Sequence, residues 1–270
     1  MTDWRFAGTG GPCLIAGPCV VESDEVMLAV ANRLAQLGQR LGIPVCFKAS
    51  YDKANRSRVD AARGPGVDRG LESLAKVRRE TGLPVLTDVH EAAQARAAAE
   101  AADVLQVPAF LSRQTDLLVA CGATGKPVNV KKGQWMDPAA MRGAVDKVRH
   151  GGSAEIAVTE RGTFFGYGDL VVDMRNFERV RSAAMVPVLF DATHSVQRPG
   201  QGAGGTSGGA RECIPALLLA AAAAGADGFF IETHPDPTRA LSDAETQWPL
   251  DQLEALVGRA VTIWRTARAA

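Results

Sequence analysis

Short apolar runs alternate with longer amphipathic stretches along the whole chain. Each run is seven or eight residues long, is rich in β-branched residues and is bounded by turn-forming or charged residues. This pattern is typical of strands in a parallel sheet that is buried on both faces. There are eight such runs, and they lie at residues 13–19, 44–50, 84–90, 103–109, 127–133, 155–161, 187–194 and 228–234. The sequence therefore predicts eight strands.

The stretches between these runs have the periodicity and the end signals of helices. Residues 23–42 begin with Ser23, which is suited to an N-cap, and residues 67–82 end with Gly82, which is suited to a C-cap. Residues 91–102 are mostly alanine, which favours a helix that packs closely against a sheet. A last helix is predicted from about Pro249 to Ala267, with the proline in its first turn.

The alternation of strand and helix fits a known architecture. Eight strand–helix units in one chain of 270 residues match a (β/α)₈ barrel, whereas a doubly wound sheet more often has five or six strands. We therefore expect one α/β domain, a TIM barrel over residues 1–270. Residues 1–12 precede the first unit and form a short N-terminal extension that is expected to plug the barrel floor or form a hairpin. The Gly-rich residues 202–209 lie in a long loop, where a cover for the active site is expected.

Composition limits the classes of partner. The chain has 46% hydrophobic and 22% charged residues, as in ordinary globular proteins. Lys and Arg together number 30 and so do Asp and Glu, which argues against binding of nucleic acid or of anionic lipid. An anionic ligand would have to be bound by a local cluster of cations.

Several features together predict a cytoplasmic protein. The most apolar segment, residues 213–226, is 14 residues long and ends at Asp227, so it is too short to span a bilayer. The first residues lack the uninterrupted apolar core of a signal peptide. The five cysteines have no CxxC spacing, which is unlike a disulfide framework.

Three cations lie near the ends of predicted strands, where a barrel of this class builds its catalytic face. They are Lys48, Lys131 and Arg161. A cation directed into a barrel mouth requires an anion beside it, and a phosphate or carboxylate of a ligand is the natural candidate. The alternative is that each cation pairs with a carboxylate of the barrel, such as Asp88 or Glu160.

The loop after the second predicted strand is a second candidate for anion binding. Residues 52–57 read DKANRS and offer an amine, an amide, a guanidinium and a hydroxyl. Arginine can bind a phosphate with two hydrogen bonds while neighbouring donors take the other oxygens. Such a loop is more often solvated surface, but its place beside Lys48 favours a ligand.

A mixed set of metal-ligand side chains also lies at strand ends. The set is Cys19, His194, Glu232 and Asp243. Thiolate, imidazole and carboxylate together suit Mn²⁺, Fe²⁺, Co²⁺ or Zn²⁺ better than Mg²⁺. Taken alone, the pattern around Cys19 favours a small buried apolar side chain. His90 and His234 also end strands, and the sequence does not choose between a chemical and a packing role for them.

Several motifs in sequence order resemble one enzyme family. They are IAGPC (15–19), FKASYDKANRS (47–57), LTDVHE (86–91), LQVPAFLSRQTDLL (105–118), VNVKKGQW (128–135), TERGTFFGYGDLVVDM (159–174), FDATHSVQ (190–197) and ETHPDP with ALSDA (232–244). Together they are similar to the 3-deoxy-D-manno-octulosonate 8-phosphate synthase family. That family condenses phosphoenolpyruvate with D-arabinose 5-phosphate and water for lipopolysaccharide assembly, and it releases inorganic phosphate.

The resemblance implies a role for each matching residue. The phosphoenolpyruvate site would be Lys48, Gln106, Ala109, Lys131 and Arg161, and the arabinose 5-phosphate site would be Lys53, Asn55, Arg56, Ser57 and Asp88. The catalytic set would be Lys48, Asp88, Lys131 and Arg161, with Lys48 as a proton donor by hypothesis. A homotetramer is implied as well.

The resemblance also bears on the metal. Metal-dependent members have Cys in the motif IAGPC and metal-independent members have Asn, so Cys19 implies the metal-dependent class with His194, Glu232 and Asp243 as the other ligands. This replaces the packing interpretation of Cys19. The ion would orient the aldehyde or, as a second choice, lower the pKa of a bound water.

Two other functions compete with this interpretation. The related synthase that makes a seven-carbon heptulosonate 7-phosphate from erythrose 4-phosphate shares the GPC motif, but its sugar-phosphate loop reads more like KPRTS than the KANRS of residues 53–57. A barrel that binds sugar phosphates without catalysis is the other, but binding alone would not need all the cations and metal-ligand candidates.

Overall fold

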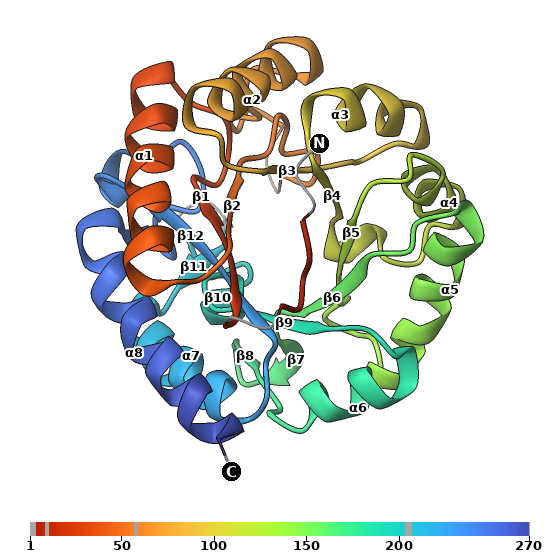
Figure 1. Ribbon diagram of the computed structural model, residues 1–270, viewed down its shortest axis with the longest axis vertical. Helices are drawn as coiled ribbons and strands as arrows, with labels where there is room; N and C mark the ends of the chain where they lie inside the picture. Colours follow the sequence, from red (N-terminus) through yellow and green to blue (C-terminus); the bar gives the residue numbers. More distant parts are fainter. Residues whose placement is uncertain (1–3, 9–10, 57–58, 203–206, 270) are drawn as a thin grey trace.

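The predicted (β/α)₈ barrel is confirmed. The computed structural model describes residues 4–8, 11–56, 59–202 and 207–269, and in this part of the chain eight parallel strands close into a barrel inside a ring of eight α-helices (Figure 1). The barrel strands are β1 (Cys13–Gly17), β2 (Val45–Lys48), β3 (Val85–Asp88), β4 (Val104–Val107), β5 (Val128–Lys131), β6 (Ile156–Glu160), β9 (Val188–Asp191) and β12 (Gly228–His234). Each lies within one of the eight predicted runs.

The barrel closes between its first and last strands. The strands pair in the order β1, β2, β3, β4, β5, β6, β9, β12, and β12 returns to β1 with Cys13 opposite Gly228 and Gly17 opposite Glu232. This register brings the turn after β1, which carries Cys19, next to the end of β12. Residues from the first and the last strand of the barrel, which are far apart in sequence, therefore lie side by side.

Most of the helices are amphipathic and pack their apolar faces on the strands, whereas the helices over residues 115–123 and 214–223 are apolar without a marked polar face. They are α1 (Asp24–Leu41), α2 (Val67–Thr81), α3 (Ala95–Ala101), α4 (Thr115–Ala123), α5 (Met141–Gly151), α6 (Asn176–Ala184), α7 (Ile214–Ala223) and α8 (Leu250–Arg268). Ser23 caps α1 through Val26 N, and Gly82 ends α2 in the left-handed conformation with φ +70°, as predicted. The alanine-rich segment forms α3, whose Ala95, Ala98 and Ala101 are buried.

Short elements extend the loops at the carboxyl ends of the strands. They are the 3₁₀ helices Ala92–Gln94, Ala109–Leu111, Pro138–Ala140, His194–Val196, Arg211–Cys213 and Pro237–Arg239, and the strands β7 (Thr163–Gly166), β8 (Asp169–Val171), β10 (Gln197–Arg198), β11 (Gly208–Gly209) and β13 (Trp248–Pro249). The hairpin of β7 and β8 was not predicted from the sequence. Its signal is the Gly166-Tyr167-Gly168 turn, where Tyr167 and Gly168 have φ of +55° and +105°.

The N-terminal extension fills one end of the barrel. Trp4 and Phe6 are buried and belong to a core cluster inside the strands, together with Cys13, Ile15, Cys46, Leu86, Val104, Ala157, Leu189 and Phe230. The backbone N–H of Phe6 donates to Glu155 Oε1 at 2.9 Å, and Ala7 pairs with Pro12 in an antiparallel bridge. This end is therefore closed, and ligands reach the barrel from the other end.

Replacing Phe6 by alanine should lower the free energy of unfolding by about 3 kcal/mol, because the variant leaves a cavity in the cluster inside the barrel. Phe6 has no exposed surface, whereas Phe165 on the β7–β8 hairpin is 90% exposed. Phe165→Ala is thus a matched control that should change stability by less than about 0.5 kcal/mol. Urea unfolding followed by circular dichroism measures both, and equal values for the two variants would contradict the plug.

Candidate active site

A cavity opens at the carboxyl ends of the strands. It has a volume of about 580 Å³, and its walls come from the ends of β2, β3, β4, β5, β6, β9 and β12 and from the loops that follow them. The structure brings most of the predicted site residues to this cavity: Lys48, Lys53, Asn55, Arg56, Asp88, Gln106, Ala109, Lys131, Arg161, His194, Glu232 and Asp243. Ser57 lies outside the described residues. Cys19 is buried behind Ser242 and Asp243.

Lys48, the last residue of β2, lies between two carboxylates. Its Nζ donates to Glu232 Oε1 at 2.5 Å and to the backbone oxygen of Cys19 at 3.0 Å, and it lies 3.9 Å from Asp88 Oδ2. The side chain is 1% exposed. Its charge is therefore balanced by the barrel, as the alternative interpretation of the sequence allowed, while it still lines the cavity.

Lys131, the last residue of β5, is held from two sides. Its Nζ pairs with Asp191 and lies 3.1 Å from the centre of the Phe230 ring. Burial lowers the pKa of Lys131 to about 8, even though the negative charge of Asp191 acts in the opposite direction. Lys131 is thus a fixed cation whose charge is poorly hydrated, which strengthens its attraction for an anion.

Arg161 follows β6 and has an unused donor. Its Nη2 donates to Gln197 Oε1 at 2.6 Å, and its Nη1 is buried without a hydrogen-bond partner among the described residues. Burial lowers the pKa of Arg161 although Asp191 and Asp243 favour the charged form. A buried guanidinium with a free N–H at a cavity wall is suited to bind a phosphate or carboxylate.

Asp88, the last residue of β3, begins a polar chain across the barrel. Gln106 Nε2 donates to Asp88 Oδ1 at 2.7 Å, Asn129 Nδ2 donates to Gln106 Oε1 at 2.8 Å, and Thr159 Oγ1 donates to Asn129 Oδ1 at 2.8 Å. Burial alone would raise the pKa of Asp88, but the charges of Lys48 and Lys53 outweigh it and hold that pKa below its usual range. Asp88 is therefore an ionised acceptor. Asn129 and Thr159 were not predicted as site residues, although a polar residue within an apolar strand indicates such a network.

The loop after β2 carries a second free guanidinium donor. Arg56 Nε donates to the backbone oxygen of Ala62 at 2.8 Å, while its Nη2 is buried without a partner among the described residues. The loop is closed at its base, where Arg63 Nε donates to Asp52 Oδ1 at 2.8 Å and Lys53 N donates to the oxygen of Arg63 at 2.8 Å. The loop can thus present Arg56 and Asn55 to the cavity.

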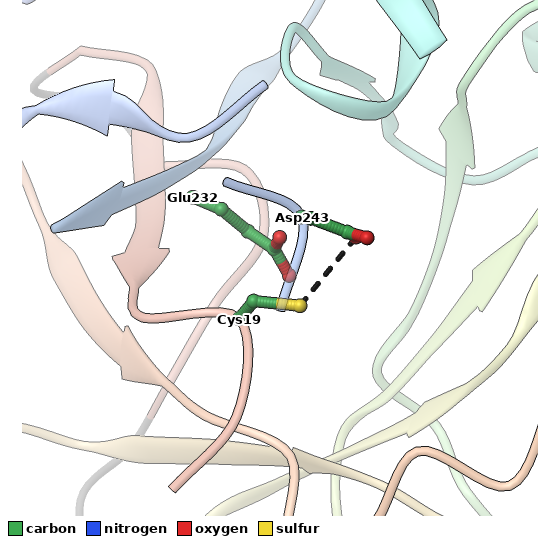
Figure 2. A group of neighbouring side chains, drawn as sticks. All are labelled: Cys19, Glu232 and Asp243. Atoms are coloured by element: carbon green, nitrogen blue, oxygen red, sulfur yellow. Dashed lines mark hydrogen bonds between the residues drawn. The ribbon is translucent and has the colours of Figure 1, made fainter. Parts of the chain in front are cut away.

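Three side chains converge in the arrangement of a metal site. Cys19, Glu232 and Asp243 point toward one another, and their ligand atoms lie within 4.8 Å of each other (Figure 2). Glu232 Oε2 is buried and has no hydrogen-bond partner among the described residues, so it is an unsatisfied acceptor directed at the group. These donors fit a borderline divalent cation.

His194 lies close to two of these three side chains, Glu232 and Asp243. Its Nε2 lies 3.5 Å from Glu232 Oε2 and 3.5 Å from Asp243 Oδ2, and its Nδ1 contacts Asp191 Oδ2 at 2.7 Å. A carboxylate on the second ring nitrogen orients histidine ligands in many metal sites. Asp191 was not predicted, and it links this group to Lys131 on the neighbouring wall.

Electrostatics around the group favour an added cation. Burial raises the pKa of the Cys19 thiol, and the nearby Asp243 and Glu232 raise it further. Burial would lower the pKa of His194, but the charges of Asp191 and Glu232 raise it instead. A bound divalent ion would reverse both effects, since it favours thiolate and neutral imidazole.

The remaining strand-end histidines differ in position. His90 lines the cavity and packs edge-on against Tyr51 at 5.6 Å between ring centres. His234 is buried, and its Nε2 contacts Glu22 Oε2 at 3.3 Å. Its Nδ1 accepts the backbone N–H of Asp236, so His234 has a structural role.

Comparison with known sequences identifies the family. The sequence model of the DAHP synthetase I family matches residues 4–264. The chain belongs to this family. Its relatives include the 2-dehydro-3-deoxyphosphooctonate aldolase of Syntrophotalea carbinolica, which is 54% identical over 94% of this chain and 91% of the relative. Those of Nitratidesulfovibrio vulgaris (52% over 93% and 91%) and Trichlorobacter lovleyi (55% over 91% and 90%) carry the same name.

Within the DAHP synthetase I family, these relatives decide between the two synthases considered from the sequence. Their name refers to the eight-carbon product, so the resemblance drawn from the motifs is confirmed and the heptulosonate alternative is not favoured.

Proposed function

We propose that this chain condenses phosphoenolpyruvate with D-arabinose 5-phosphate and water to give 3-deoxy-D-manno-octulosonate 8-phosphate and inorganic phosphate. One observation carries the proposal. The guanidinium groups of Arg161 and Arg56 come from different loops and line the same cavity, and each has one buried N–H nitrogen without a hydrogen-bond partner among the described residues. Two phosphorylated substrates would explain two such groups, and the names of the relatives agree with these substrates.

The phosphoenolpyruvate site would lie on the side of the cavity formed by β2, β4, β5 and β6. Its residues would be Lys48, Gln106, Ala109, Lys131 and Arg161. Lys131 and Arg161 supply two fixed positive charges for the carboxylate and the phosphate. Gln106 is held in place between Asp88 and Asn129.

The arabinose 5-phosphate site would use the loop after β2 and the end of β3. Its residues would be Lys53, Asn55, Arg56, Ser57 and Asp88. Arg56 would bind the phosphate, and the ionised Asp88 would accept hydrogen bonds from sugar hydroxyls. Lys53 lies 3.8 Å from Glu232 Oε1, so this site would lie next to the proposed metal ligands.

A divalent ion, one of Mn²⁺, Fe²⁺, Co²⁺ or Zn²⁺, is proposed to be held by Cys19, His194, Glu232 and Asp243. The unsatisfied Glu232 Oε2 and the convergence of Cys19, Glu232 and Asp243 support this ligand set. When bound, such an ion supplies Lewis acidity that orients and polarises a substrate oxygen. Asp191 would hold the His194 ring for this role.

Three residues of the chain, Lys48, Lys131 and Arg161, are proposed to act in the condensation itself. A bond forms between carbon 3 of phosphoenolpyruvate and the aldehyde carbon, and the aldehyde oxygen takes up a proton. Water adds its oxygen to carbon 2, which has lost its double bond to carbon 3, and gives up one proton. The hydroxyl formed in this way becomes the carbonyl of carbon 2 as the bond to the phosphate oxygen breaks, so inorganic phosphate leaves with that electron pair and takes up the remaining proton. Lys48 lies between Glu232 and Asp88 at the cavity wall, where it could give the proton. Lys131 and Arg161 would hold the phosphate as it leaves.

The choice of aldose tests this function. Purified protein should form product from phosphoenolpyruvate and arabinose 5-phosphate in preference to erythrose 4-phosphate. Product masses identify which sugar was extended. Preferred turnover of erythrose 4-phosphate would contradict the assignment, and failure to release phosphate with either sugar would favour a binding protein without catalysis.

Arg56→Ala should raise KM for arabinose 5-phosphate by about 100-fold and leave KM for phosphoenolpyruvate within about twofold. The reason is that Arg56 would bind only the sugar phosphate. Arg69→Ala, which removes an exposed arginine on α2, is the matched control and should change neither value. Steady-state kinetics with each substrate varied in turn measures the effect, and an equal loss for both substrates would argue against two separate sites.

Two further properties belong to the proposal. The homotetramer is proposed from the family resemblance; exposed aromatic side chains near the cavity mouth, where Phe110 and Trp135 stack at 5.8 Å and are 53% and 44% exposed, support only a contact surface for another chain. A cytoplasmic location is supported by the five cysteines, which are all free. In the described part of the chain, no helix has the length and hydropathy needed to cross a membrane.

A further inference from the structure

A buried ion pair lies just outside the cavity walls. Lys132 follows Lys131 at the end of β5, and Glu160 is the last residue of β6. Lys132 Nζ lies 3.6 Å from Glu160 Oε1, and neither side chain has exposed surface. Neither residue lines the cavity. Burying two charges costs free energy that their attraction only partly offsets, so the pair needs an explanation other than stability.

The contacts of Glu160 are directed at the connection between β6 and β7. Its Oε1 accepts the backbone N–H of Gly162 at 2.7 Å, and its Oε2 accepts Asn176 Nδ2 at 3.0 Å. Gly162 has φ +89°, a conformation that other residues rarely adopt. The carboxylate therefore holds a tight turn against the first residue of α6.

Lys132 contacts the same connection between β6 and β7. Its Nζ donates to the backbone oxygen of Gly133 at 3.2 Å and to Thr163 Oγ1 at 3.3 Å. Thr163 begins β7, so Lys132 and Glu160 contact the two residues that follow Arg161, while Glu160 itself precedes it in the chain. Successive side chains of an extended segment point to opposite faces, which is why Lys131 and Arg161 line the cavity while their neighbours Lys132 and Glu160 do not.

We infer that the Lys132–Glu160 pair is a positioning device for Arg161, which it fixes so that the unpartnered Nη1 meets an anionic substrate group. Arg161 is the residue enclosed by these contacts, and it is only 6% exposed. Among the described side chains, Gln197 is the one hydrogen-bond partner of Arg161. The direction of the Arg161 side chain therefore depends on the backbone that Glu160 and Lys132 hold. This inference rests on the proposed function, in which Arg161 binds phosphoenolpyruvate.

Glu160→Gln tests the inference, because it keeps the shape of the side chain and removes the charge. The dissociation constant of phosphoenolpyruvate should rise about tenfold, since a small displacement of a binding group has a large effect. The dissociation constant of arabinose 5-phosphate should stay within about twofold. Calorimetric titration of the purified full chain measures both, and thermal unfolding measures stability separately.

The decisive comparison repeats the substitution in a chain that also carries Arg161→Ala. A pair that acts through Arg161 should have no further effect on phosphoenolpyruvate binding there, although the melting temperature should still fall. A tenfold loss in both backgrounds would overturn the inference. Asp103→Asn is the matched control: Asp103 is a buried carboxylate that accepts Val85 N at 3.1 Å at the amino end of the barrel, and its loss should leave phosphoenolpyruvate binding unchanged.

A milder variant covers the case in which Glu160→Gln does not fold. Asn176→Ala removes one donor to Glu160 and leaves the ion pair in place, and it should raise the dissociation constant of phosphoenolpyruvate about threefold. An unchanged constant in the folded variant would overturn the inference. Failure of the proposed function gives a different result, since the unaltered chain would then bind phosphoenolpyruvate without releasing phosphate in the presence of arabinose 5-phosphate.

Discussion

Removal of divalent metal with a chelator should lower the rate of condensation by about 100-fold or more, and added Mn²⁺ should restore it. The reason lies in the group of Cys19, Glu232 and Asp243, whose ligand atoms converge within 4.8 Å while Glu232 Oε2 accepts no hydrogen bond from any residue that the structure describes. Phosphate release before and after chelation measures the effect. Undiminished activity in protein shown to be free of metal would contradict the proposed site.

Substitution of Cys19 separates metal binding from general damage to the barrel. Cys19→Ala should lower the metal content per chain by at least about tenfold, because it removes the one sulfur ligand. Cys46→Ala is the matched control, since Cys46 is equally buried but lies in the cluster that plugs the barrel. Atomic emission analysis of both variants decides the matter, and equal metal contents would argue against Cys19 as a ligand.

Lys131→Ala should lower kcat/KM for phosphoenolpyruvate by about 1000-fold. Lys131 is held over the Phe230 ring and against Asp191, so its charge is fixed in the cavity and would act without reorganisation when phosphate leaves. Lys76→Ala, which removes a surface lysine paired with Asp24, should have no effect on kcat/KM. Steady-state kinetics measures kcat/KM of both variants, and circular dichroism checks that each is folded. A folded Lys131→Ala enzyme with near-normal kcat/KM would exclude the proposed role of the Lys131 charge.

The barrel could be predicted from the sequence because its strands are buried on both faces. Such strands read as continuous apolar runs, and all eight runs contain a barrel strand. The ends of the strands could not be predicted with the same accuracy. The predicted run that contains β2 continues to Ser50, whereas the strand ends at Lys48. The β7–β8 hairpin escaped prediction because its exposed Phe165 and Tyr167 do not alternate with polar residues as in a half-buried strand.

Much of the candidate site could also be predicted, because this fold collects strand-end residues on one face. Lys48, Lys131 and Arg161 line the cavity for that reason. Polar residues within apolar strands indicate that a network such as that from Asp88 to Thr159 exists, but its pairings could not be predicted, since they depend on the register of four strands. Asp191 was missed because a single aspartate in an apolar strand does not reveal its partners.

The proposed condensation can be tested by quantifying both of its products in a single assay. Metal-loaded protein is incubated with phosphoenolpyruvate and arabinose 5-phosphate, and inorganic phosphate and the new sugar acid are quantified together. We expect an eight-carbon acid phosphate and inorganic phosphate in equal amounts, with neither formed when either substrate is omitted. Phosphate release that does not require arabinose 5-phosphate, or release without the eight-carbon product, would contradict it.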